Sequence, residues 1–292
     1  MTTLSPLTRR LFKLPLPPPS PTSNHSSLPT FLAHATRTSL PPTSTTYIGT
    51  HYEYTTQATL LHSALLLHRT GGRSDSGLDL LGTWHLPTHE HPLRVLVQCK
   101  ALKTKLGPNL VRELEGTFSQ APVGWRGNGV VGVLVSPREA TKGVREALAR
   151  SRFPLVWFLV GLGGGLRQVL WNAGVEALGV GGLGVQMVYG GDGDGKGVEL
   201  MWDGEEIPGV EEVVGRMEDV QRRWFGLWDV GVERYEEVVG VVERLFPEEK
   251  PLLYASDGRV SGLSSEEKEV VRRCLHGADI EHEREGSKLG ST

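Results

Sequence analysis

The chain reads Gly71-Gly72-Arg73-Ser74-Asp75-Ser76-Gly77-Leu78-Asp79-Leu80-Leu81-Gly82 and, further on, Val95-Leu96-Val97-Gln98-Cys99-Lys100, and these two stretches decide the predicted fold. In the first, Asp79 opens an apolar run. In the second, Gln98 and Lys100 follow an apolar run and are two positions apart. Because side chains alternate between the faces of a strand, Gln98 and Lys100 are expected on one face and Cys99 on the other. Carboxylate and amide oxygens can hold a hard divalent cation, and a lysine can stand beside an attacking water. The pattern therefore indicates phosphodiester chemistry.

The elements around these stretches predict an α/β fold. Ala58, Leu61 and Leu65 indicate a helix that begins near Tyr47, runs through Leu67 and carries Glu53 in its first turns. The following elements are then expected in order: strands at Leu78–Trp84 and Leu93–Cys99, a helix from Asn109, a strand at Val130–Val135, a helix opening at Ser136-Pro137-Arg138-Glu139, and a strand at Leu155–Val160. This α-β-β-α-β-α-β order predicts a mixed sheet flanked by helices.

Four residues, Glu53, Asp79, Gln98 and Lys100, occur on these elements in the order found in a known superfamily. Over about residues 47–160 the chain resembles the restriction-endonuclease-like PD-(D/E)xK superfamily, in its Mrr-like branch, where glutamine replaces the middle acid. The resemblance implies a restriction-endonuclease-like αββαβ core.

The same resemblance implies roles for individual residues. Asp79 would be the principal metal ligand, Gln98 would offer its amide oxygen, and Glu53 would bind directly or through water. Cys99 would contribute only its backbone carbonyl, and Lys100 would orient or help deprotonate the attacking water. Oxygen ligands with waters suit Mg²⁺, with Mn²⁺ as the alternative ion. Glutamine in place of an acid removes one negative charge and weakens metal affinity.

The N-terminal segment has the composition of a targeting peptide. Residues 1–52 contain no Asp or Glu, and 18 of them are Ser or Thr. Leu4, Leu7, Leu11 and Leu14 form one helical stripe opposite basic residues, which is typical of a mitochondrial transit peptide. The alternative is a disordered basic tail. We expect residues 1–46 to be transit peptide and linker, followed by an endonuclease-like domain over residues 47–167.

Charge is distributed unevenly along the chain. Residues 94–167 carry 12 Lys or Arg against 4 Asp or Glu, although the whole chain has a net charge of −3. Clustered cations suit a phosphate backbone, so Lys103, Lys105 and Arg112 are predicted to contact nucleic acid. Solvated helix faces would give the same composition, and charge alone does not separate the two interpretations.

Composition changes beyond Gly161, where seventeen glycines fall within residues 161–215. Short apolar runs at Val185–Tyr189 and Val198–Trp202 predict strands, and acidic helices are expected at Val210–Trp228 and Val232–Phe246. A last helix is expected from Ser264. We therefore expect an extension over residues 168–276 and an unstructured tail over residues 277–292.

Several motifs have simpler explanations than a ligand site. Residues 179–184 match GxGxxG, but a strand-like run follows them rather than a helix, which argues against dinucleotide binding. Residues 192–197 begin like a calcium loop but place Lys196 where an oxygen ligand is required. His85, His89 and His91 are expected to be solvated loop residues, and Asp75 is expected to be a turn residue.

The chain from its N-terminal segment through the glycine-rich extension also resembles the fungal mitochondrial "required for respiratory growth" family with an endonuclease-like fold. That resemblance implies a mitochondrial matrix protein that supports respiration through mitochondrial DNA. The alternative function is a catalytically silent nucleic-acid-binding or assembly factor, and RNA is an alternative substrate. No apolar run is long enough to span a membrane, and a homodimer is an open expectation.

Overall fold

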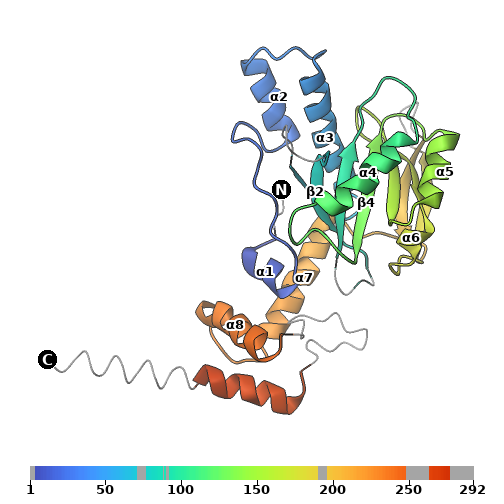
Figure 1. Ribbon diagram of the computed structural model, residues 1–292. Helices are drawn as coiled ribbons and strands as arrows, with labels where there is room; N and C mark the ends of the chain where they lie inside the picture. Colours follow the sequence, from blue (N-terminus) through green and yellow to red (C-terminus); the bar gives the residue numbers. More distant parts are fainter. Residues whose placement is uncertain are drawn as a thin grey trace. The chain divides into compact units, whose positions relative to one another are not determined.

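A six-stranded mixed sheet organises the larger part of the computed structural model (Figure 1). The structure describes residues 4–70, 77–87, 89, 92–189, 196–247 and 263–276. The strands lie side by side in chain order: β1 (Leu65–Arg69), β2 (Leu80–Trp84), β3 (Leu93–Cys99), β4 (Val130–Ser136), β5 (Leu155–Val160) and β6 (Leu166–Trp171). Strands β3, β4 and β5 run parallel to one another, and the remaining pairs are antiparallel. The predicted mixed sheet is confirmed.

Helices cover both faces of this sheet. On one face, α3 (Thr45–Leu61) packs Tyr52 and Leu60 against Val95 and Val97. On the other face lie α4 (Asn109–Gln120) and α5 (Lys142–Arg150), whose apolar residues are buried in one cluster with residues of β4 and β5, and Figure 1 shows α4 in front of the strands. Strands β4 and β5 are buried along their whole length, as expected for central parallel strands with helices on both sides.

The glycine-rich extension packs on the same core. It contains α6 (Ala173–Glu176) and a second, three-stranded sheet of β7 (Leu183–Tyr189), β8 (Lys196–Trp202) and β9 (Glu205–Glu206). Leu183, Leu200 and Trp202 are buried in one cluster with Val95 and Val97. Apolar burial therefore joins this extension to the main sheet.

The chain divides into two compact units, one of Leu16–Val213 and one of Met1–Pro15 with Val214–Thr292. The divisions expected at residues 46, 167 and 276 stay predictions. The second unit contains α1 (Pro6–Leu11), η1 (Val232–Arg234), α8 (Tyr235–Leu245), most of α7 (Val210–Phe225) and a helix over residues 265–276. Arg10 of α1 forms ion pairs there with Glu236 at 2.6 Å and Glu243 at 2.8 Å.

Two helix boundaries were predicted wrongly. The helix expected to run through Leu67 ends at Leu61, because Ala64 adopts a left-handed conformation and the following leucines form β1. The helix expected from Ser136 begins instead at Lys142, where the Thr141 hydroxyl accepts from the N–H of Val144 at 3.3 Å. Ser136 ends β4, and its hydroxyl accepts from the N–H of Arg138 in a local turn.

The N-terminal segment contains more regular structure than a linker requires. Helix α2 (Leu28–Arg37) lies within residues 15–46, and its Phe31 packs against Tyr54 of α3. The transit peptide stays a prediction, and the predicted tail over residues 277–292 lies outside the described residues. No helix in the described ranges is long and apolar enough to span a membrane.

Candidate functional site

The ends of β2 and β3 bring Asp79 and Gln98 together. Asp79 immediately precedes β2, and its N–H donates to the carbonyl of Val97 at 2.9 Å. One carboxylate oxygen of Asp79 accepts from the N–H of Cys99 at 2.6 Å. Asp79 is thus bonded to the residues on both sides of Gln98, so the carboxylate is fixed to the end of β3.

Gln98 is buried, with 4% of its surface exposed. Its amide Nε2 donates to the carbonyl of Gly77 at 2.9 Å, which fixes which end of the amide is the oxygen. The buried oxygen, Oε1, has no hydrogen-bond partner within the described part of the chain. An unpaired buried amide oxygen costs roughly 1–3 kcal/mol, and an amide oxygen can bind a hard cation.

Lys100 lies just beyond β3 on the side of α4. Its N–H donates to the carbonyl of Val135 at 2.8 Å, which continues the pairing with β4. Its Nζ forms an ion pair with Glu113 of α4 at 3.2 Å, and both side chains are partly exposed. Leu96, Gln98 and Lys100 occupy alternate positions, so they share one face of β3. Leu96 packs in a different apolar cluster from Val97, which lies on the opposite face. The predicted alternation of faces is therefore confirmed.

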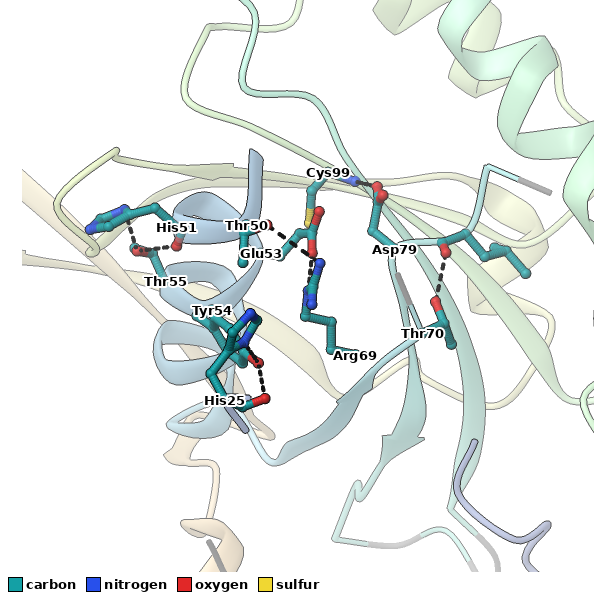
Figure 2. A network of polar contacts seen from close by, with 11 residues as sticks. His25, Thr50, His51, Glu53, Tyr54, Thr55, Arg69, Thr70, Asp79 and Cys99 are labelled. Atoms are coloured by element: carbon teal, nitrogen blue, oxygen red, sulfur yellow. Dashed lines mark hydrogen bonds and ion pairs between the residues drawn. The ribbon is translucent and has the colours of Figure 1, made fainter. Parts of the chain in front are cut away.

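Glu53 of α3 is held by an arginine that the sequence did not indicate. Figure 2 shows its carboxylate directed at Arg69 of β1, with which it forms a largely buried ion pair. Arg69 also lies over the ring of Tyr54 at 5.5 Å and donates to the Thr50 hydroxyl at 3.4 Å. The charge of Glu53 is thus compensated inside the chain.

Cys99 lies between the two acids on the α3 side of the sheet (Figure 2). Burial raises the pKa of its thiol well above the usual value, and the negative charges of Asp79 and Glu53 raise it further. The thiol is therefore neutral at physiological pH, which suits the expectation that only its backbone takes part in the site.

These residues fit a magnesium site by their chemistry. Asp79 offers a carboxylate and Gln98 a buried amide oxygen, which are hard ligands that Mg²⁺ prefers, whereas the Glu53 carboxylate on the α3 side is already paired with Arg69. Within the described ranges no three His, Cys, Asp or Glu side chains gather as a metal cluster. A metal here would consequently depend on the Gln98 oxygen as a ligand.

The predicted nucleic-acid contacts lie next to this site in the chain. Lys103 and Lys105 are exposed in the segment that directly follows Lys100, and Arg112 is exposed on α4. Other cations of the basic segment have structural partners: Arg94 donates to three loop carbonyls, those of Gly124 at 2.7 Å, Arg126 at 2.9 Å and Asn128. The surface available to phosphate is therefore smaller than the sequence count suggests.

The histidines and glycine motifs have other roles. His85 is buried and bonds to the Thr83 hydroxyl at 2.9 Å, and the His89 ring bonds to the carbonyl of Leu178 at 2.9 Å. The expectation that they are solvated was wrong, because both contribute to packing. Strand β7 begins at Leu183 within the GxGxxG match, so a strand rather than a helix comes after its first glycines, as expected. Asp75, His91 and residues 192–195 lie outside the described residues.

Comparison with known proteins shows what this chain is similar to. A family model described as "Required for respiratory growth protein 7" matches residues 44–91 and 87–189, which together make half of the chain. The chain belongs to this family. The match covers α3, the six-stranded sheet and β7, so it includes every element that positions Glu53, Asp79, Gln98 and Lys100.

Family relatives come from several yeasts. The chain is 31% identical over 152 residues to an uncharacterized mitochondrial protein of Schizosaccharomyces pombe, covering 51% of this chain and 60% of that protein. It is 30% identical over 159 residues to the mitochondrial required for respiratory growth protein 7 of Saccharomyces cerevisiae, covering 40% of this chain and 66% of that protein. It is also 30% identical over 159 residues to the protein of the same name from Eremothecium gossypii, covering 41% of this chain and 66% of that protein. The matched region thus spans somewhat less than two thirds of these relatives. No solved structure matches the chain.

The ion-pair partners of Glu53 and Lys100 were not predicted from the sequence. Arg69 lies in a leucine-rich stretch that was expected to end a helix, so its position beside Glu53 could not be anticipated. Glu113 is an acid on the helix that follows Lys100. Its charge, opposite to that of Lys100, was the one feature of the sequence that could have predicted their ion pair.

Proposed function

We propose that this chain is a mitochondrial matrix protein whose restriction-endonuclease-like domain cleaves phosphodiester bonds in mitochondrial DNA, in support of respiratory growth. The observation that carries the proposal is the buried Gln98 oxygen, unpartnered in the described chain, at the strand end to which the Asp79 carboxylate is bonded. The names of the relatives, mitochondrial and required for respiratory growth, support the location and the process.

Asp79, Gln98 and Glu53 would hold Mg²⁺ in this proposal. When bound, the ion would supply Lewis-acid polarisation of the scissile phosphate. Asp79 is held ready by the N–H of Cys99, and Gln98 by the carbonyl of Gly77. Both ligands are therefore positioned before substrate arrives, which lowers the entropy lost on binding.

Lys100 would orient the attacking water and offset negative charge on the phosphate. Its ion pair with Glu113 is partly exposed, and such pairs contribute only about 0–1 kcal/mol. A DNA phosphate can therefore displace Glu113 at little cost. Lys103 and Lys105 would hold the adjoining phosphates.

A catalytically silent nucleic-acid-binding factor is the second candidate, and a specific observation favours it. Two of the four proposed catalytic groups, Lys100 and Glu53, form ion pairs with Glu113 and Arg69 inside the chain. The Glu53 pair is mostly buried and is harder to break than the Lys100 pair. A protein that binds nucleic acid without cutting it does not need Lys100 or Glu53 to be available for catalysis, so both ion pairs are compatible with this function.

The test is a cleavage assay of the full chain on plasmid DNA, single-stranded DNA and RNA, with Mg²⁺ or with EDTA. Magnesium-dependent cutting that Lys100→Gln abolishes, while Lys142→Gln leaves it unchanged, supports the nuclease. Lys142 is the matched control because its side chain is 88% exposed and pairs with a glutamate on its own helix. Salt-dependent binding without any cutting would establish the silent factor instead.

A further inference from the structure

Among the residues that the structure describes, β7 is an edge strand with an apolar surface. It occupies one end of the β7-β8-β9 sheet, with β8 as its neighbour in the described chain. An edge strand presents N–H and C=O groups that a further strand can pair with. Natural proteins usually protect such edges with charged residues, proline or bulges, but all seven residues of β7 (Leu183–Tyr189) are uncharged and none is proline.

Three exposed apolar side chains lie together on this strand. Val185, Met187 and Tyr189 are 41%, 54% and 72% exposed, and they alternate along β7, so they share one face. In the described ranges no other helix or strand exposes more than one large apolar side chain. Three together on an edge strand indicate a surface that another molecule covers.

The strand is complementary to itself. If two copies of β7 pair antiparallel about a two-fold axis at Gln186, Val185 of each copy lies opposite Met187 of the other, and Tyr189 lies opposite Leu183. Val188 then lies opposite Gly184, the two Gln186 amides face each other, and no like charges meet. A C2 dimer requires this kind of self-matching patch.

We propose that two copies of this chain form a homodimer by pairing their β7 strands into a continuous six-stranded sheet. One seven-residue strand pair lies at the small end of specific interfaces, below about 1,200 Å² in total, so we expect a dissociation constant in the micromolar range. The proposal is independent of nuclease activity, because neither Asp79 nor Gln98 lies in the interface.

Sedimentation velocity of the full chain from about 1 to 200 µM tests it, since this range spans micromolar dissociation constants. Wild type should shift from monomer to dimer, and Met187→Lys should raise the dissociation constant at least tenfold by placing charge in the apolar contact. Val123→Lys, at a loop residue that is 91% exposed, is the control and should dimerise like wild type. A monomeric wild type, or a Met187→Lys variant that dimerises equally well, would overturn the proposal.

Cross-linking tests the register, in a Cys274→Ser background. Residues directly opposite have Cα atoms about 4.5–5.5 Å apart, within disulfide reach, so Gln186→Cys should form a covalent dimer under mild oxidation. Val188→Cys is the matched control, because its two copies would lie about 13 Å apart in this register. Equal cross-linking by both variants would exclude pairing about Gln186.

Discussion

Replacing Gln98 with methionine should separate the function of this residue from its contribution to folding. The Gln98 oxygen is buried and unpartnered in the described structure, and removing it recovers roughly 1–3 kcal/mol of desolvation free energy. The substitution also removes the bond from Nε2 to the carbonyl of Gly77, at a cost of about 1 kcal/mol. Methionine has nearly the same length and shape and leaves no large cavity. The metal-free variant should therefore be more stable than wild type by roughly 0–2 kcal/mol.

Thermal unfolding with and without Mg²⁺ provides the assay. A change of 1 kcal/mol moves the midpoint by about 2–4 °C for a unit of this size. At Mg²⁺ concentrations about 100 times the dissociation constant, wild type should gain about 2.7 kcal/mol and Gln98→Met should gain much less. Gln57→Met is the matched control, because Gln57 is also buried and donates to a backbone carbonyl, that of Leu67, at 2.6 Å. It should retain the full Mg²⁺ response.

Two results would refute this reasoning. Destabilisation of metal-free Gln98→Met by more than about 2 kcal/mol would mean that the amide oxygen makes a stabilising contact in the folded protein. An undiminished Mg²⁺ response in Gln98→Met would mean that the oxygen does not bind the ion.

Three further variants have defined outcomes. Arg94→Ala should destabilise the protein by about 2–4 kcal/mol in urea denaturation, because three loop carbonyls lose their donor, and an effect under 1 kcal/mol would contradict this role. Replacing Lys103 and Lys105 with glutamine should weaken DNA binding for all sequences and lower the salt slope by about 2, whereas an unchanged slope would remove them from the interface. Because the pKa of the Cys99 thiol is raised in the folded chain, the unfolded chain loses this proton at a lower pH than the folded chain does. Stability should therefore fall as pH rises above about 8.5, and Cys99→Ala should flatten that decline relative to wild type.

The elements that the sequence predicted best are those whose periodicity has one interpretation. Strand β3 alternates core residues with Gln98, and α4 repeats its apolar residues every four positions, so both were placed correctly at their starting residues. The run Leu65–Leu67 is apolar at every position, and such a run fits a buried strand as well as a helix. Only the left-handed turn at Ala64, which a sequence does not reveal, separates α3 from β1.

Within the candidate site, contacts between neighbouring strands could be predicted from the sequence, but contacts between helices and the sheet could not. Asp79 immediately precedes β2 and Gln98 lies on β3, so their positions at one end of the hairpin follow from the pairing of β2 with β3. The Glu53–Arg69 and Lys100–Glu113 pairs depend instead on how α3 and α4 pack on the sheet. Tertiary packing sets those contacts, and no spacing within either element encodes them.

Asp79→Asn tests the central claim, Mg²⁺-dependent cutting at this site, most directly. The change keeps the shape of the side chain and an oxygen that can accept from the N–H of Cys99, but removes the charge that would bind Mg²⁺. Cutting of plasmid DNA and DNA affinity should be measured on the same preparations. We predict at least a 100-fold loss of cutting, with DNA binding retained or tightened because a repelling carboxylate is gone. Cutting at the wild-type rate by Asp79→Asn, or no Mg²⁺-dependent cutting of any DNA or RNA by wild type, would contradict the account.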